Sequence, residues 1–250
     1  MIDLGGRKVL VTGGSRGIGR ATALLAARAG ADVGITYRSR REQAEAATRE
    51  LRALGRKAWC GGGDHADSQV AERLVGECAE ALGGLNGLVV NHGIWPEADI
   101  PLTGMSDAHW RETMAANLDG LFYITRAALR RMTGGGRVVL ISSTAGQRGE
   151  SFHADYAASK GAVISMTKSL AGECAPTITV NAVAPGWVET DMTAGALQGG
   201  GRSRVEAGIP LRRIPPPEDI AGPIVFLLSD LARHITGEIL NVNGGSVLCG

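Results

Sequence analysis

The chain has 250 residues, of which 44% are hydrophobic and 20% are charged, a composition typical of an ordinary globular protein. Its 26 basic and 25 acidic residues give a net charge of +1, which argues against a nucleic-acid-binding surface and against a polybasic membrane anchor. No apolar run reaches the roughly 18 residues of a membrane helix, and the first residues lack the pattern of a signal peptide. We therefore expect a cytoplasmic protein with no nucleic-acid or membrane partner.

The four cysteines are widely separated and form no Cys-x-x-Cys pair; they are Cys60, Cys78, Cys174 and Cys249. This spacing fits neither a zinc ribbon nor a disulfide framework, so reduced thiols are expected. The five histidines show no metal-ligand spacing either. The sequence therefore predicts chemistry that uses no metal.

Short runs of β-branched residues alternate along the chain with longer stretches of helical periodicity. The strand-like runs cover residues 8–12, 32–37, 57–60, 85–91, 137–142, 178–184 and 238–243. The helix-like stretches cover about 17–29, 40–54, 68–82, 107–132, 155–174 and 218–230. This alternation predicts right-handed βαβ crossovers and the α/β class. We expect one Rossmann-like domain over residues 1–250, a doubly wound parallel sheet of about seven strands in three layers, with ligands beyond the carboxyl ends of the strands.

A glycine-rich loop joins the first predicted strand to the first predicted helix, with the sequence TGGSRGIG at residues 12–19. Glycines at this junction permit a tight turn and let backbone N–H groups approach a pyrophosphate, while the helix N-terminus adds its positive dipole. A tight turn without a ligand is the alternative. We interpret the loop as a dinucleotide-binding site formed by Gly13, Ser15, Arg16, Gly17, Ile18 and Gly19.

The residues after the second strand indicate which dinucleotide binds. A cofactor without a 2′-phosphate is usually held there by an acidic residue, but this strand is followed by Arg38 and Ser39. Arg38 and Arg16 can face the same pocket, and two guanidinium groups suit a phosphate dianion. NADP(H) is therefore favoured over NAD(H), although Arg38 could instead belong to a solvated helix start. After the third strand, Asp64 could bind the adenine amino group or be an ordinary loop acid, and we place its neighbour His65 at the same site.

A serine, a tyrosine and a lysine follow the fifth predicted strand. Ser143 lies just after that strand, while Tyr156 and Lys160 lie one turn apart on one face of the next helix. An ammonium about 4 Å from a phenol contributes on the order of 4 kcal/mol, enough to lower the phenol pKa by up to about three units before desolvation opposes it. Tyr156 then becomes a credible proton donor to a carbonyl oxygen that Ser143 could also hold. For the tyrosine–lysine pair alone, an exposed helix pair is the alternative.

Taken in order, the glycine loop, Asn117, Ser143 and the pair of Tyr156 and Lys160 resemble the short-chain dehydrogenase/reductase family. The resemblance extends from Leu4 to Gly245 and, within the family, is to bacterial 3-oxoacyl-[acyl-carrier-protein] reductases and their carbonyl-reductase relatives. It implies that Tyr156 is the general acid/base, that Ser143 orients the substrate, and that Lys160 binds the nicotinamide ribose while lowering the tyrosine pKa. It also implies that Asn117 positions a water molecule in a proton relay.

The same resemblance implies further cofactor contacts. The nicotinamide half would be contacted by Pro185, Gly186, Val188 and Thr190, and the adenosine side of the crevice would be floored by Asn91 and Gly93. The family's usual Asn-Asn-Ala-Gly is replaced here by the sequence VNHG at residues 90–93. We expect the histidine of this sequence, His92, to be structural rather than catalytic.

Five residues on strand-end loops near these groups are expected to line a substrate pocket: Trp95, Gln147, Glu150, His153 and Trp187. His153 could hydrogen-bond a polar substrate or be a solvated residue at a helix start. Acyl-carrier reductases tend to place basic residues near the end of the tyrosine–lysine helix, but residues 171–176 contain none. The polar groups favour hydroxylated or small keto substrates at least as much as a long acyl chain.

The leading hypothesis is an NADPH-dependent carbonyl reductase, similar to a 3-oxoacyl-thioester reductase, that acts on a small molecule. A sugar or polyol dehydrogenase, or another alcohol dehydrogenase, is the alternative. A non-catalytic dinucleotide-binding sensor is a rival of a different class. The complete set of Asn117, Ser143, Tyr156 and Lys160 argues against the sensor, because a sensor needs no proton donor. The resemblance also implies a homotetramer or a dimer.

Overall fold

Seven parallel strands form one sheet in the computed structural model, which describes residues 2–248 and so leaves Cys249 outside the described residues. The spatial order of the strands is β3-β2-β1-β4-β5-β6-β7. All seven predicted strands are present: β1 (Lys8–Val11), β2 (Asp32–Tyr37), β3 (Ala58–Gly62), β4 (Gly87–Val90), β5 (Gly136–Ile141), β6 (Ile178–Pro185) and β7 (Ile239–Val242). Between β1 and β4 the strand order reverses, which is where open α/β sheets form their binding crevice.

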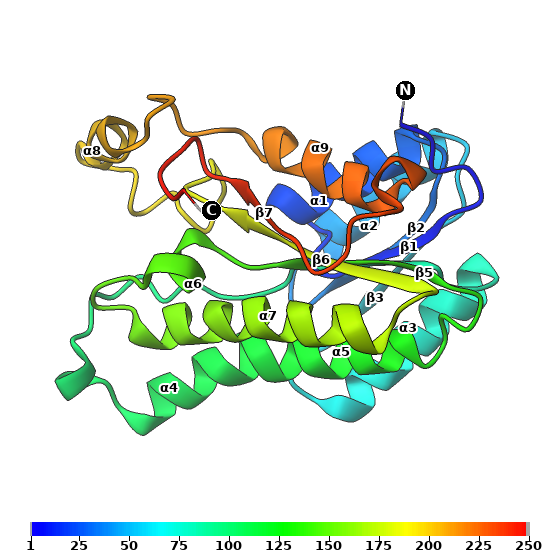
Figure 1. The fold of residues 1–250 in the computed structure, drawn as a ribbon, viewed down its shortest axis with the longest axis horizontal. Coiled ribbons are helices and arrows are strands. Elements are labelled where there is room, and N and C mark those ends of the chain that lie inside the picture. The colour runs from blue at the N-terminus through cyan, green and yellow to red at the C-terminus, as the bar shows by residue number, and fades with distance from the viewer. Residues whose placement is uncertain (1, 249–250) are drawn as a thin grey trace.

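Helices cover both faces of the sheet, which gives the expected three layers (Figure 1). One face carries α1 (Gly17–Arg28), α2 (Arg41–Ala53) and α9 (Pro217–Leu228). The other face carries α3 (Ser68–Leu82), α5 (Gly120–Leu129) and α7 (Ala154–Glu173), with α4 (Asp107–Met114) beside α7. Within residues 2–248, no helix combines the length and the apolar character that crossing a bilayer requires.

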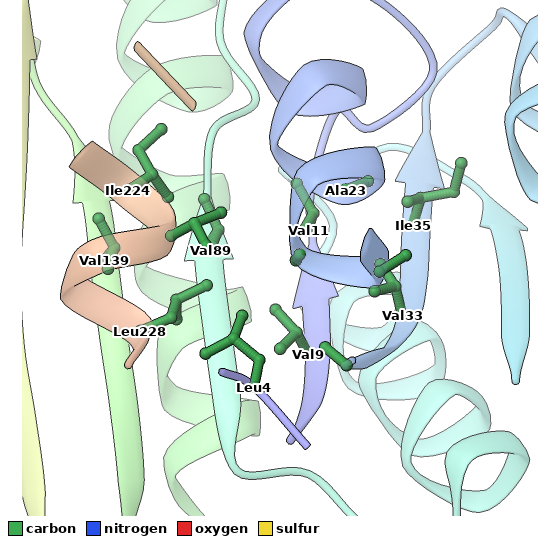
Figure 2. Close-up of a cluster of buried hydrophobic side chains, with 14 of the residues drawn as sticks. Leu4, Val9, Val11, Ala23, Val33, Ile35, Val89, Val139, Ile224 and Leu228 are labelled. Carbon is green, nitrogen blue, oxygen red and sulfur yellow. The ribbon is translucent and has the colours of Figure 1, made fainter. Parts of the chain in front are cut away.

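The strands are apolar on both sides because each side packs against a helix layer. On the face of α1 and α9, the core contains Val9, Val11 and Val89 (Figure 2). Their neighbours along the strands, Leu10 and Leu88, point to the opposite face and pack among the residues of α3 and α5. The near-continuous apolar runs of the sequence therefore reflect strands that are buried on both faces.

Two features of the helices differ from the sequence-based prediction. The single helix expected over residues 107–132 is divided into α4 and α5 by a π-helical segment, η2 (Ala115–Asp119). Apolar periodicity does not reveal one extra residue in a turn, so the division was not predicted. The other elements absent from the prediction are short: α6 (Thr144–Arg148), α8 (Gly201–Gly208) and the 3₁₀ turns η1 (Leu102–Gly104) and η3 (Asp230–Ala232). Such pieces have too few buried residues to show a periodic apolar face.

The start of α1 packs so closely on the glycine-rich loop that it leaves no space for a side chain. A Cβ atom added at Gly19 would lie 2.3 Å from the carbonyl oxygen of Gly13 and 2.6 Å from Nδ2 of Asn91. At Gly172, in the last turn of α7, an added Cβ would meet nothing within 4 Å. The first glycine is therefore required by packing, and the second is not.

We expect Gly19→Ala to lower the free energy of unfolding by about 1–3 kcal/mol, because the methyl group meets backbone that cannot move aside cheaply. Gly172→Ala is the matched control and should be neutral or stabilising by up to about 1 kcal/mol, since alanine favours a helix over glycine. Urea unfolding measures both changes. Equal effects of the two substitutions would show that the loop can accommodate a side chain.

Candidate active site

A cavity of about 290 Å³ lies beyond the carboxyl ends of the strands. It is lined by residues that follow β1, β2, β3, β4, β5 and β6, together with two side chains of α7. Of the residues predicted from the sequence, it brings together Gly13, Ser15, Arg16, Gly17, Ile18, Arg38, Ser39, Asp64, His65, Asn91, Gly93, Trp95, Ser143, Glu150, Tyr156, Lys160, Pro185, Gly186, Trp187, Val188 and Thr190.

Four residues predicted for the site are not among those that line the cavity. Gly19 and Asn117 lie directly behind its wall, and Asn117 is fully buried. The Nε2 atom of Gln147 donates a hydrogen bond of 2.6 Å to Oδ1 of Asn241. His153 is buried and lies with its Nε2 3.0 Å from Oδ1 of Asp99. Gln147 and His153 therefore lie outside the cavity lining, where their side chains contact other residues of the protein.

Several lining residues were not singled out from the sequence: Tyr37, Arg40, Ile94, Ala116, Ile141, Ser142, Thr144, Ala145, Asp191, Met192 and Thr193, together with His92, which was assigned a structural role. Most of them directly follow a strand or adjoin a residue that was predicted. Position relative to the strand ends was therefore the signal that could have found them. Chemistry alone could not, because many are apolar or hydroxyl side chains.

The glycine-rich loop is held in shape by the end of β4. The hydroxyl of Thr12 accepts a hydrogen bond of 3.0 Å from the backbone N–H of Asn91, whose side-chain amide donates to the carbonyl of Thr12 at 3.2 Å. Gly17, which lines the cavity at the start of α1, has a φ of +53°, a conformation that side chains disfavour. A bare loop backbone at a helix N-terminus is the arrangement that accepts a pyrophosphate, so the residues present fit a dinucleotide.

Two histidines that line the cavity stack on each other. The rings of His65 and His92 have centroids 4.3 Å apart. Each also contacts a threonine at a strand end, with 2.7 Å between Nε2 of His65 and Oγ1 of Thr36, and 2.8 Å between Nδ1 of His92 and Oγ1 of Thr12. Burial lowers the pKa of His65 to about 4 and the pKa of His92 well below its usual value, so both rings are neutral near pH 7.

Near the end of β5 the cavity holds the serine, the tyrosine and the lysine. Ser143 caps α6 by accepting a hydrogen bond of 3.1 Å from the N–H of Ala145. The Nζ atom of Lys160 donates to the carbonyl of Ile141 at 2.9 Å and lies 5.8 Å from the ring centroid of Tyr156. Because Ile141 ends β5, the lysine ties α7 directly to the strand that carries Ser143.

Asn117 fastens the loop after β4 to α7 from behind the cavity. Its Oδ1 accepts a hydrogen bond of 2.7 Å from the N–H of Ile94, and its Nδ2 donates to the carbonyl of Ile94 at 3.0 Å and to Oγ of Ser159 at 3.2 Å. Both amide hydrogens are therefore used within the protein. The π-helical segment η2 carries this side chain into the interior.

Burial decides the protonation of the tyrosine and the lysine. It raises the pKa of Tyr156 to about 12; a hydrogen bond with Ser143 opposes that rise, and the charge of Glu150 adds to it. Burial also lowers the pKa of Lys160 to about 8. The prediction that the lysine would bring the tyrosine pKa below its usual value is wrong for this structure, since burial raises that pKa and the effect that opposes the rise is the hydrogen bond with Ser143.

Aromatic side chains enclose the space beside Tyr156. The ring of Trp95 meets that of Tyr156 edge to face at 4.7 Å, and it lies 4.2 Å from the ring of His153 on its other side. Trp187 approaches Trp95 at 6.2 Å from across the cavity. Glu150 is a charged lining residue here, and its carboxylate lies 3.3 Å from Nη2 of Arg148. A substrate would therefore meet two indoles and one carboxylate.

No acidic residue directly follows β2. Arg38 and Arg40 lie there instead, and both line the cavity together with Arg16 of the glycine-rich loop. These three guanidinium groups can attract a further phosphate group, in addition to the pyrophosphate of a dinucleotide.

Comparison with known proteins agrees with this arrangement. The family model for enoyl-(acyl carrier protein) reductase matches residues 13–246. The chain is 38% identical over 242 residues to the 3-oxoacyl-[acyl-carrier-protein] reductase FabG of Staphylococcus aureus, a match that covers 96% of this chain and 97% of the reductase. It is also 38% identical to an L-rhamnose 1-dehydrogenase (NAD(P)(+)) of a Sphingomonas species, over 97% of this chain and 96% of that protein.

Among solved structures, the fold matches that of a short-chain dehydrogenase from Burkholderia cenocepacia in complex with NADP, with a TM-score of 0.92 and 36% identity. That match covers 97% of this chain and 98% of the Burkholderia chain. Both the sequence and the fold of this chain match those of known reductases and dehydrogenases over nearly its full length. The chain belongs to the short-chain dehydrogenase/reductase family and is an NAD(P)-dependent oxidoreductase that acts on carbonyl or hydroxyl groups.

Proposed function

We propose that the protein is an NADPH-dependent carbonyl reductase that converts a ketone to a secondary alcohol and also catalyses the reverse reaction. The observation that carries this proposal is the distribution of groups along one cavity. Ser143, Tyr156 and Lys160 line it near the end of β5, whereas Arg16 and Arg38 follow β1 and β2, on the other side of β4 in the sheet. Hydride chemistry needs the first group of residues, and a 2′-phosphate would attract the second.

The bound nicotinamide dinucleotide supplies the hydride. Tyr156 donates its phenolic proton to the substrate oxygen, and the hydroxyl of Ser143 holds the same oxygen as negative charge develops on it. A tyrosine pKa of about 12 keeps the phenol protonated at neutral pH, which is the form that reduction requires. Alcohol oxidation needs the phenolate instead, so it becomes easier as the pH rises.

Lys160 and Asn117 both support this proton donor. Protonated Lys160 stabilises negative charge on the tyrosine oxygen. When the lysine is neutral, this electrostatic stabilisation is lost. Asn117 holds Ile94, at the start of the substrate wall, and Ser159 on α7. Its further role in positioning a water molecule for a proton relay is part of this proposal.

The similarity to FabG supports a 3-oxoacyl thioester as substrate. A second candidate is a sugar or polyol, and the lining of the substrate end favours it. Glu150 can accept hydrogen bonds from hydroxyl groups, while Trp95 and Trp187 offer flat apolar faces. The identity with the L-rhamnose 1-dehydrogenase supports this candidate as well.

The first test measures NADPH and NADH consumption with an acetoacetyl thioester, small ketones and keto-sugars. We expect turnover with NADPH to exceed turnover with NADH. Fast reduction of the thioester would assign the protein to the 3-oxoacyl reductases, whereas turnover of keto-sugars alone would favour the second candidate. Preference for NADH throughout would contradict the proposed use of Arg16 and Arg38.

Replacing the proton donor separates catalysis from binding. We expect Tyr156→Phe to lower kcat by at least about 100-fold, the usual size of a general-acid contribution, while the Kd for NADPH stays within about twofold. Tyr123→Phe is the matched control, because it removes the same hydroxyl from α5, outside the cavity lining. A Tyr156→Phe variant that retains turnover would rule out the proposed mechanism.

The lowered pKa of Lys160 predicts a pH-dependent stability of the cofactor-free protein. The unfolded chain keeps this lysine protonated up to about pH 10.5, whereas the folded chain releases the proton near pH 8. Below pH 8 the buried charge of the lysine destabilises the folded state. Between pH 8 and 10.5 the free energy of unfolding rises with pH, because the unfolded state binds more protons than the folded state. We therefore expect Lys160→Met to be more stable than the wild type at pH 7, with the difference shrinking by on the order of 3 kcal/mol by pH 10.

Urea unfolding at several pH values measures this difference, and the other titrating groups cancel because both proteins contain them. A stability difference that does not change between pH 7 and pH 10 would mean that Lys160 remains protonated in the folded protein.

A further inference from the structure

The arginines assigned to the 2′-phosphate each face a carboxylate across the cavity lining. Nη1 of Arg16 lies 2.8 Å from Oδ2 of Asp191, and Nη2 of Arg38 lies 3.4 Å from Oδ2 of Asp64. The first distance is that of a charge-assisted hydrogen bond, and the second is a looser ion pair. All four residues line the same cavity. Arg16 is therefore the more firmly held of the two guanidinium groups.

Asp191 reaches Arg16 from the loop that follows β6. This loop comes close to the glycine-rich loop, since a Cβ added at Gly17 would lie 3.3 Å from Cγ2 of Thr190. Thr193 fixes its shape by donating to the carbonyl of Val188 at 2.6 Å and accepting from the N–H of Thr190 at 3.2 Å. The backbone that carries Asp191 is thus held by hydrogen bonds within its own loop.

The ion pair between Arg16 and Asp191 is open to exchange. The side chains are 43% and 67% exposed, so water competes for both charges and the pair is weak. Arg16 stands at the N-terminus of α1, and its long side chain can turn from the carboxylate to a phosphate without moving the backbone. A 2′-phosphate that recruits Arg16 must first displace Asp191.

We propose that Asp191 determines how strongly the protein discriminates between NADP(H) and NAD(H), by competing with the 2′-phosphate for Arg16. This inference rests on the proposed assignment of Arg16 to that phosphate. Only the phosphorylated cofactor requires the exchange, so only its affinity is reduced by the ion pair. Removing the carboxylate therefore increases the preference for NADP(H).

A second effect of Asp191 must be separated from this one. Its negative charge lies beside a cavity that receives a polyanion, so its removal also strengthens binding of both cofactors in general. Glu189 provides the matched control, because it lies on the same loop, carries the same charge and pairs with Arg202 instead. Glu189 is not among the residues that line the cavity.

The test measures Kd for NADPH and NADH by calorimetry, without substrate, for the wild type, Asp191→Asn, Asp191→Ser, Glu189→Gln, Arg16→Gln and the double variant Arg16→Gln/Asp191→Asn. We expect both Asp191 variants to raise the ratio of the NADH Kd to the NADPH Kd by about three- to fivefold, the most that an exposed ion pair supplies. Glu189→Gln should leave the ratio unchanged, and in the Arg16→Gln background the loss of Asp191 should no longer alter it.

The outcomes separate this inference from the proposed cofactor. If Arg16→Gln weakens NADPH binding but the Asp191 variants leave the ratio unchanged, the role of Asp191 is refuted while the assignment of Arg16 stands. An equal shift with Glu189→Gln would refute it too, since general electrostatics would then explain the effect. If Arg16→Gln does not weaken NADPH binding, the assignment of Arg16 fails and the inference falls with it. Thermal melting of every variant verifies that each is folded.

Discussion

The reversal of winding between β1 and β4 is the constraint on which the rest of this structure depends. From β1 the chain continues into α1 on one face of the sheet, and from β4 it leads to α4 and α5 on the other. Because these two strands are neighbours, their connections diverge and leave a crevice at the carboxyl edge. Every other strand of the parallel sheet ends at that same edge. Residues separated by more than a hundred positions in the sequence therefore meet around one cavity.

Several supports hold this crevice in a fixed shape. Asn91 joins β4 to the glycine-rich loop, Asn117 joins the next segment to α7, and Lys160 joins α7 to the end of β5. Each of these polar side chains bonds to backbone, so the positions of the loops do not depend on flexible surface contacts. The groups proposed for chemistry are therefore presented by a network of supports that is largely buried.

Features that depend on a local pattern of residues could be predicted from the sequence. The seven strands follow from apolar runs, and the tight glycine-rich loop between β1 and α1 follows from glycines at a strand-to-helix junction. Contacts between residues that only the tertiary structure brings together could not be predicted from the sequence. Gln147 is adjacent to the site in sequence, but its amide donates a hydrogen bond to Asn241 on β7. The ring of His153 contacts Trp95, which lies on a loop more than fifty residues earlier in the sequence. The direction of the tyrosine pKa shift was also mispredicted, because the depth of burial of Tyr156 is a property of the fold and not of the residues beside it.

The stacked histidines have a consequence for the way the cavity responds to acidity. With the pKa of His65 near 4 and that of His92 well below its usual value, neither ring gains a proton across the physiological range. The two stacked rings thus contribute no charge that varies with the medium. The pKa of Lys160, by contrast, lies near 8, within one or two units of neutrality. Both histidines therefore stay neutral over the pH range in which Lys160 changes its charge, so a change of charge in this cavity near pH 8 comes from the lysine and not from the stacked rings.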